Sequence, residues 1–165
     1  MNILENLNER LQIVDGNPCR GGEDIVKHVV ETSPIPLPED YLEFLKEISG
    51  KTDGQEQILG PELGVKKDDG MLSIYIFSAQ TALEIHTEYK IYSAPVYDDI
   101  IDMIWLIGND LGDLLYFYGE GKEGYGLYVS EAGALCFEDA DKIAVTLTDF
   151  LVKGIGINTA LWIND

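Results

Sequence analysis

The sequence predicts an α+β domain, with helices packed on one face of an antiparallel or mixed β-sheet of about five to six strands. Three observations support this class. Helical spacing of apolar residues dominates the N-terminal third, closely spaced β-forming runs fill positions 104–137, and a helix-capping pattern follows at position 146. The runs between 104 and 137 lie too close together for crossover helices, so we expect antiparallel pairing. No repeat or long linker divides the 165 residues, and we expect a single domain over residues 1–165.

Two helices are expected before residue 33. Over Met1–Val14, leucines at positions 4, 7 and 11 recur at helical spacing, and turn residues follow from Asp15. Over Glu23–Glu31, two pairs of apolar residues stand one helical turn apart. We expect both helices to turn these apolar faces toward the core.

A third helix is expected directly after Pro38, because proline suits the first helical position, where its missing N–H costs nothing. The carboxylates of Glu39 and Asp40 suit the positive end of the helix dipole. Residues 33–37 contain two prolines and should form an extended linker. Gly50 is expected to end the helix in the left-handed conformation. The expected inward stripe is Tyr41, Phe44, Leu45 and Ile48.

The middle of the chain alternates between polar and apolar segments. Residues 51–70 are polar and rich in turn residues, so we expect an exposed connection with a short strand near Gln57–Leu59. Met71–Phe77 should form a central strand, because both of its alternating faces are largely apolar. Ser78 should cap a helix that extends to about Tyr89.

A polar turn between two β-forming runs predicts a hairpin over Ile104–Tyr118. Asn109, Asp110 and Asp113 could in principle surround a calcium ion. They lack the spacing and the terminal glutamate of an EF-hand, so we interpret them as turn-capping residues.

The segments after the hairpin complete the sheet and close the domain. Residues 119–124 should form a flexible loop into a strand at 126–129, and a turn at 131–133 should lead into a strand at 134–137. The pattern from Thr146 to Asp149 resembles a capping box that opens a helix containing Phe150 and Leu151. The tail from residue 155 is apolar enough to dock on the domain.

The charge of the chain restricts its partners. Thirty acidic and eleven basic residues give a formal net charge of −19, which repels nucleic acids and anionic membranes and attracts basic proteins. Taken alone, this composition is also explained by solubility. The N-terminus lacks the features of a secretion signal, and no apolar run is long enough to cross a membrane, so we expect a cytoplasmic protein. Cys19 and Cys136 are therefore expected to be reduced, although a disulfide between them is an open alternative.

No catalytic motif stands out. His28 and His86 have no neighbouring histidine or cysteine at ligand spacing, and the chain has no serine-nucleophile motif, P-loop or dinucleotide-binding fingerprint. The aromatic residues at 116–118 and 125–128 could stack on single-stranded nucleic acid, but that use needs a basic groove. We therefore expect a binding protein, not an enzyme, with no metal and no cofactor.

Three segments, in the correct order, carry a family resemblance. They are Leu37-Pro38 with Tyr41, Phe44-Leu45 and Gly50; Ile107-Gly108-Asn109-Asp110-Leu111-Gly112-Asp113; and Ile143-Ala144-Val145-Thr146 with Phe150-Leu151. Over roughly residues 37–156 the chain resembles the SUKH superfamily, which includes many bacterial immunity proteins and a yeast cell-wall regulator. The resemblance implies the SUKH fold. An acidic residue common in the family is replaced near Tyr118, and Leu127-Tyr128 stands in place of a frequent tryptophan.

The resemblance also implies a function. Bacterial members are commonly encoded beside polymorphic or contact-dependent toxins, many of them nucleases with basic clefts, and neutralise them by binding. The net charge favours the same hypothesis: a non-catalytic immunity protein that occludes the cleft of a basic toxin, with a nuclease domain as the expected partner. The alternatives are an interaction scaffold or regulator without a toxin partner, and a small-molecule binder or hydrolase that uses the carboxylate-rich turns. The residues expected to bind the partner are Glu120, Glu123, Tyr125, Tyr128, Glu131, Glu138, Asp139 and Asp141.

Overall fold

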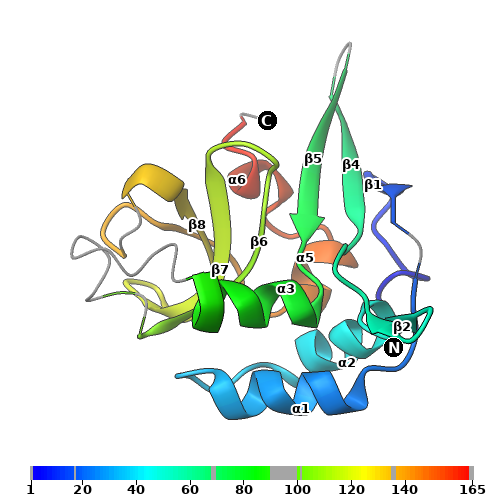
Figure 1. Cartoon of the computed structure of the whole chain (residues 1–165). Coiled ribbons are helices and arrows are strands. Elements are labelled where there is room, and N and C mark those ends of the chain that lie inside the picture. The colour runs from blue at the N-terminus through cyan, green and yellow to red at the C-terminus, as the bar shows by residue number, and fades with distance from the viewer. Residues whose placement is uncertain are drawn as a thin grey trace.

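The computed structural model describes residues 2–16, 18–67, 70–89, 100, 102–134 and 137–163. In this part of the chain, a curled seven-stranded antiparallel sheet has the order β1-β4-β5-β6-β7-β8-β9, and β2 and β3 form a separate pair (Figure 1). The α+β class and the antiparallel sheet are confirmed, with seven strands in place of the expected five to six. The strands are β1 (Leu11–Asp15), β2 (Lys51–Thr52), β3 (Gln55–Glu56), β4 (Glu62–Lys67), β5 (Gly70–Ile76), β6 (Ile104–Asn109), β7 (Leu114–Gly121), β8 (Gly124–Glu131) and β9 (Asp141–Ala144). The helices are α1 (Glu23–Thr32), α2 (Glu39–Ile48), α3 (Ala79–Glu84), α5 (Leu147–Leu151) and α6 (Ile157–Ala160), with a π-helix η1 (Ile85–Tyr89) and a 3-10 helix η3 (Ala132–Ala134).

Helix α2 forms where the sequence predicts it, although Pro38 is its N-cap and not its first helical residue. The helix connects to the centre of the sheet. Its expected inward residues are all buried, Tyr41 among them. The Tyr41 ring lies 5.6 Å from the Tyr118 ring of β7, and its hydroxyl accepts a hydrogen bond from Trp105 Nε1 of β6 at 3.0 Å. Trp105 and Tyr118 are cross-strand partners, so α2 covers the face of the sheet that carries both.

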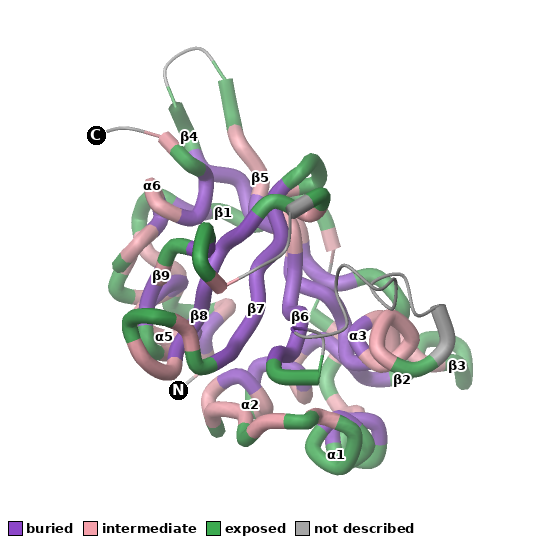
Figure 2. Tube along the Cα trace, turned by 90° about the vertical axis from the view of Figure 1, so that its left-hand side faces the viewer, coloured by how far each residue is buried: buried purple, intermediate pink, exposed green. Residues whose placement is uncertain are grey.

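The same face of β7 is covered further along by the C-terminal helices. Tyr116 lies two residues from Tyr118 and therefore on the same side of the strand. Its ring packs edge-on against Phe150 of α5, and its hydroxyl donates to the Ala160 carbonyl of α6 at 3.0 Å. Helices α2, α5 and α6 thus pack on one face, as expected. Figure 2 shows the buried segments running along β6, β7 and β8 beside these helices.

The opposite face of β7 packs against the segment that follows η3. Phe117 is stacked on its cross-strand partner Tyr128 and meets Phe137 edge-on, with ring centroids 6.0 Å apart in both pairs. Since both faces of the central strands are buried, these strands form the middle of the core.

The expected helix over Met1–Val14 is wrong for the residues described. Residues 3–6 form turns, and β1 pairs with β4, with Leu11 opposite Val65. The asparagines of this segment bond to the nearby backbone: Asn8 Oδ1 accepts from the Arg10 N–H at 3.1 Å. Such local bonds compete with the helical ladder, and pairing with the sheet edge then determines the conformation.

The expected exposed connection at 51–70 contains a strand of the main sheet. Strand β4 has β1 on one side and β5 on the other, and its Leu63 and Val65 are fully buried. The short strand expected at Gln57–Leu59 lies earlier, in the β2–β3 pair. The sequence of β4 contains few residues with high β-propensity, so propensity alone does not predict this strand. It forms because it pairs with a neighbouring strand on each side.

Two expectations after the first hairpin also need correction. The predicted loop at 119–124 is mostly strand, because β7 continues to Gly121 and β8 begins at Gly124. The strand predicted at 134–137 is not observed in the described part: η3 occupies 132–134, residues 135 and 136 lie outside the described residues, and the last strand, β9, begins at Asp141.

The remaining predicted helices and the C-terminal tail are confirmed. Ser78 caps α3, accepting from the Thr81 N–H, and Thr146 caps α5, accepting from the Asp149 N–H. In the tail, Ile157 and Leu161 are buried. Gly50 has a role other than the expected left-handed stop: a Cβ at this position would collide with the Arg20 carbonyl, so glycine permits the close approach of two chain segments.

Candidate partner-binding site

The β7–β8 hairpin ends in a two-residue turn of Lys122 and Glu123, between paired glycines at 121 and 124. The Tyr128 hydroxyl stabilises the turn, because it accepts from the Glu123 N–H at 3.1 Å and donates to the Gly124 carbonyl at 2.7 Å. The whole Tyr128 residue is buried. Tyr128 therefore builds the hairpin from inside, and the expectation that its ring is a surface anchor is wrong.

Two lysines hold neighbouring segments against this turn. Lys122 Nζ donates to the Glu138 carbonyl at 3.0 Å, and Lys142 Nζ of β9 donates to the Glu123 carbonyl at 2.9 Å. Both ammonium groups thus bind backbone oxygens. The Lys122 contact holds Glu138 beside Glu120 and Glu123 of the hairpin, and all three residues are exposed at this end of the sheet. We call these three residues the acidic hairpin end.

The other expected acidic residues are distributed around this end and beyond it. Asp139 and Asp141 are exposed and directly follow Glu138 toward β9. Glu131 is at the far end of β8, paired with Leu114. At about 3.3 Å per residue, β8 separates Glu131 from the hairpin turn by roughly 20 Å, so Glu131 is not part of the same surface.

Beside the acidic hairpin end lies an open groove of about 420 Å³. Its walls come from three distant parts of the chain: the linker before α2, the β7–β8 hairpin and the segment between β9 and α5. We call it the proline groove. It is lined by Pro36, Leu37, Pro38, Glu120, Tyr125, Val145 and Thr146.

Tyr125 joins two walls of the proline groove. Its hydroxyl donates to the Pro36 carbonyl at 2.6 Å, and its ring is stacked on buried Tyr118 with centroids 6.2 Å apart and an interplanar angle of 9°. Burial, together with the nearby Asp40 carboxylate, raises the pKa of Tyr125 to about 12. The phenol is therefore neutral near pH 7 and remains a hydrogen-bond donor.

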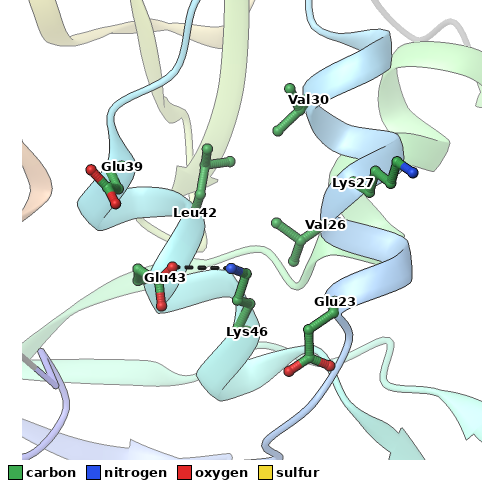
Figure 3. Close-up of a pocket in the computed structure, with 8 residues that line it drawn as sticks. All are labelled: Glu23, Val26, Lys27, Val30, Glu39, Leu42, Glu43 and Lys46. Carbon is green, nitrogen blue, oxygen red and sulfur yellow. Dashed lines mark hydrogen bonds and ion pairs between the residues drawn. The ribbon is translucent and has the colours of Figure 1, made fainter.

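A second groove, of about 310 Å³, lies between α1 and α2 (Figure 3). Val26, Val30 and Leu42 form its apolar surface. Its charged residues have both signs, and Lys46 is paired with Glu43 at 3.0 Å. This groove therefore carries charges of both signs, whereas among the described residues that line the proline groove the only charged one is Glu120.

The described residues hold no group of three or more His, Cys, Asp or Glu side chains placed to bind a metal ion. In the β6–β7 turn, Asp110 Oδ1 accepts from the N–H groups of Gly112 and Leu114, and Asn109 Oδ1 accepts from the Leu111 N–H. The turn-capping interpretation is confirmed for Asn109 and Asp110.

Two further expectations concern the cysteines and membrane-spanning segments. Cys19 Sγ lies 3.6 Å from the Lys51 carbonyl, and Cys136 lies outside the described residues. In the portion of the chain that the structure describes, the helices are too short or too polar to span a bilayer.

A comparison with protein-family models matches residues 23–153 to the SMI1/KNR4 family, also called SUKH-1. This match covers well over half of the chain. The chain belongs to the SMI1/KNR4 family (SUKH-1). No curated protein matches it.

The SUKH-1 assignment confirms the predicted family, and the three motif segments have clear positions in the fold. The Leu37-Pro38 segment forms a wall of the proline groove and the start of α2. The segment at 107–113 forms the β6–β7 turn, and Val145-Thr146 borders the groove at the start of α5. Two of the three motifs therefore meet at the proline groove.

The structure brings together part of the predicted site and adds residues that were not predicted. Glu120 and Tyr125 both line the groove. The missed residues are Pro36, Leu37, Pro38, Val145 and Thr146. Two prolines flanking a leucine could have signalled an exposed apolar linker, but no feature of the sequence marks Val145, which is 50% exposed despite following buried Ala144.

Proposed function

We propose that this SUKH-1 protein is an immunity protein that binds a basic toxin domain, such as a nuclease, and occludes its cleft without catalysis. The observation that carries the proposal is the acidic hairpin end. Three exposed carboxylates surround the turn, while Lys122 and Lys142 donate to backbone carbonyls. The SUKH-1 family supports a function in protein interaction.

The net charge of the whole chain adds to the attraction of this surface for a cationic partner. A net charge of −19 creates a long-range field that accelerates encounter with a cationic protein, and carboxylates at a rigid strand end resemble the phosphates that a nuclease cleft attracts. The hairpin is held by Tyr128 from inside and by two lysines from outside, so little ordering of the backbone is needed on binding.

Co-expression with the product of the adjacent gene tests the function directly: rescue of growth supports immunity. The surface is tested by replacing Glu120, Glu123 and Glu138 together with lysine. We expect association with the captured partner to slow by about tenfold or more at low salt, with a flatter salt dependence. A matched triple replacement of Glu9, Asp113 and Glu131, which are also exposed, produces the same net charge away from the hairpin end.

The results of these experiments distinguish between the possible contact surfaces and between the possible functions. Equal slowing by both triple variants would assign the effect to net charge and remove the hairpin end as the contact surface. Stable binding to a partner that is not toxic, with no rescue of growth, would favour an interaction scaffold or regulator. A partner with an acidic surface would overturn the proposal.

A further inference from the structure

We propose that the proline groove binds an arginine side chain of the protein partner, with the guanidinium between the Tyr125 ring and the Glu120 carboxylate. The inference rests on the proposed function only for the source of this arginine, a basic protein. The recognition itself depends on the groove. This open groove of about 420 Å³ leaves room for one long side chain.

The lining of the groove suits the aliphatic stem of an arginine. Pro36, Leu37, Pro38 and Val145 provide apolar walls. Arginine buries its methylene stem along such surfaces while its charged head stays near water. An open groove with these walls can therefore hold the stem and leave the guanidinium at the rim.

The head group has two matching partners. The Tyr125 ring is stacked on buried Tyr118 and also lines the groove, where a planar cation can stack on an aromatic ring. Glu120 is exposed and supplies a carboxylate, to which guanidinium binds in a bidentate manner. Among the described residues that line the groove, none is basic, so no side chain of the lining competes for this place.

A second carboxylate, that of Asp40, also makes the electrostatic potential near the Tyr125 ring negative. Asp40, at the start of α2, lies close enough to Tyr125 to raise the pKa of its phenol. A cation at the Tyr125 ring would therefore be attracted by Asp40 as well as by Glu120. Because the phenol donates to Pro36 O, the ring is held in place before a ligand arrives.

The test uses the full-length ¹⁵N-labelled protein and three capped tripeptides, Gly-X-Gly, in which X is arginine, its uncharged isostere citrulline, or lysine. We expect the arginine peptide to give saturable amide shifts at Leu37, Tyr125 and Val145, with a Kd on the order of 1–10 mM. Lysine should bind more weakly, because its ammonium lacks the planar face, and citrulline should not bind. Equal binding of citrulline, shifts located elsewhere, or no saturable shift at tens of millimolar peptide would overturn the inference.

Variants locate the contact. Glu120→Gln and Tyr125→Leu should each weaken arginine binding about two- to fivefold, which is typical of one exposed ion pair or one cation–π contact. Tyr125→Phe loses the bond to Pro36 O but retains the aromatic ring, so it should bind arginine more strongly than Tyr125→Leu. Glu131→Gln, at the far end of β8, removes the same charge as Glu120→Gln and should have no effect.

Preserved amide dispersion shows that each variant is folded. An equal loss in Glu131→Gln and Glu120→Gln would reduce the effect to net charge and overturn the inference. The peptide titration needs no toxin, so its failure leaves the immunity function standing, and failed rescue of growth leaves arginine binding standing.

Discussion

The Asp40 carboxylate, in the first turn of α2, accepts a hydrogen bond from the backbone N–H of Thr148, in the first turn of α5, at 2.8 Å. Its other oxygen accepts from the Tyr41 N–H, also at 2.8 Å. One side chain thus serves the N-terminal ends of two helices that are 108 residues apart in the chain. This contact joins two walls of the proline groove.

Replacing Asp40 with alanine should therefore destabilise the protein by about 1–2 kcal/mol, because the Thr148 N–H loses its acceptor and both helices lose a favourable charge. Asn at position 40 should recover part of this loss. Urea unfolding measures the effect. Glu39→Ala removes a neighbouring exposed carboxylate and should stay within about 0.5 kcal/mol; an equal loss in the two alanine variants would contradict the assigned role of Asp40.

The buried bond between Trp105 and Tyr41 should be costly to break. Tyr41→Phe removes the acceptor at 3.0 Å from Trp105 Nε1 and leaves an indole N–H buried without that partner. We expect a loss of about 1–3 kcal/mol in the free energy of unfolding. Tyr125→Phe removes a hydroxyl that bonds an exposed carbonyl and should cost less. An unchanged free energy of unfolding in Tyr41→Phe would mean that the indole N–H finds another acceptor.

His86 should make stability depend on pH. Its ring is stacked on Trp105 at 4.0 Å; Nδ1 lies 2.9 Å from the Ala82 carbonyl, and Nε2 accepts from the Leu106 N–H at 3.3 Å. Accepting at Nε2 requires the neutral imidazole, and burial lowers the pKa of His86 below its ordinary 6.5.

The unfolded chain therefore binds a proton at higher pH than the folded chain. The contribution of His86 is complete above about pH 6.5 and declines as the pH falls below it, by up to about 1.4 kcal/mol per pH unit. Unfolding curves between pH 5.5 and 7.5 measure this slope. His86→Gln should flatten this slope, and a slope that persists in His86→Gln would assign it to other groups.

Gly108 should tolerate no side chain. It pairs with Ile76 in the sheet, and a Cβ at this position would collide with the Tyr75 carbonyl oxygen. Gly108→Ala should cost about 2–4 kcal/mol, because backbone rather than a flexible side chain must move. Gly70→Ala is the matched control, since its Cβ would meet no atom within 4 Å. Thermal unfolding of the two variants distinguishes a steric requirement from a general glycine effect.

The elements that the sequence predicted correctly are those with local causes. Pro38 and the two carboxylates after it mark the start of α2, and Ser78 and Thr146 cap α3 and α5. The side chains of Asn109 and Asp110 close the β6–β7 turn by accepting hydrogen bonds from backbone N–H groups two residues further on. Each of these signals acts within a few residues, so it can be read without knowing the fold. The net charge of −19 is a sum over residues and the SUKH motifs are short segments, so both could also be read from the sequence.

Tertiary structure alone decided the strands at the sheet edges and the site. Strands β1 and β9 form because β4 and β8 offer unpaired backbone groups, and this pairing outweighs the helical spacing of the first residues. The proline groove exists only because folding brings residues 36–38, Tyr125 and Val145 together, and Tyr128 is buried although the sequence allowed an exposed ring. Local preferences are properties of short segments, whereas burial and the grouping of distant side chains depend on how the whole chain packs.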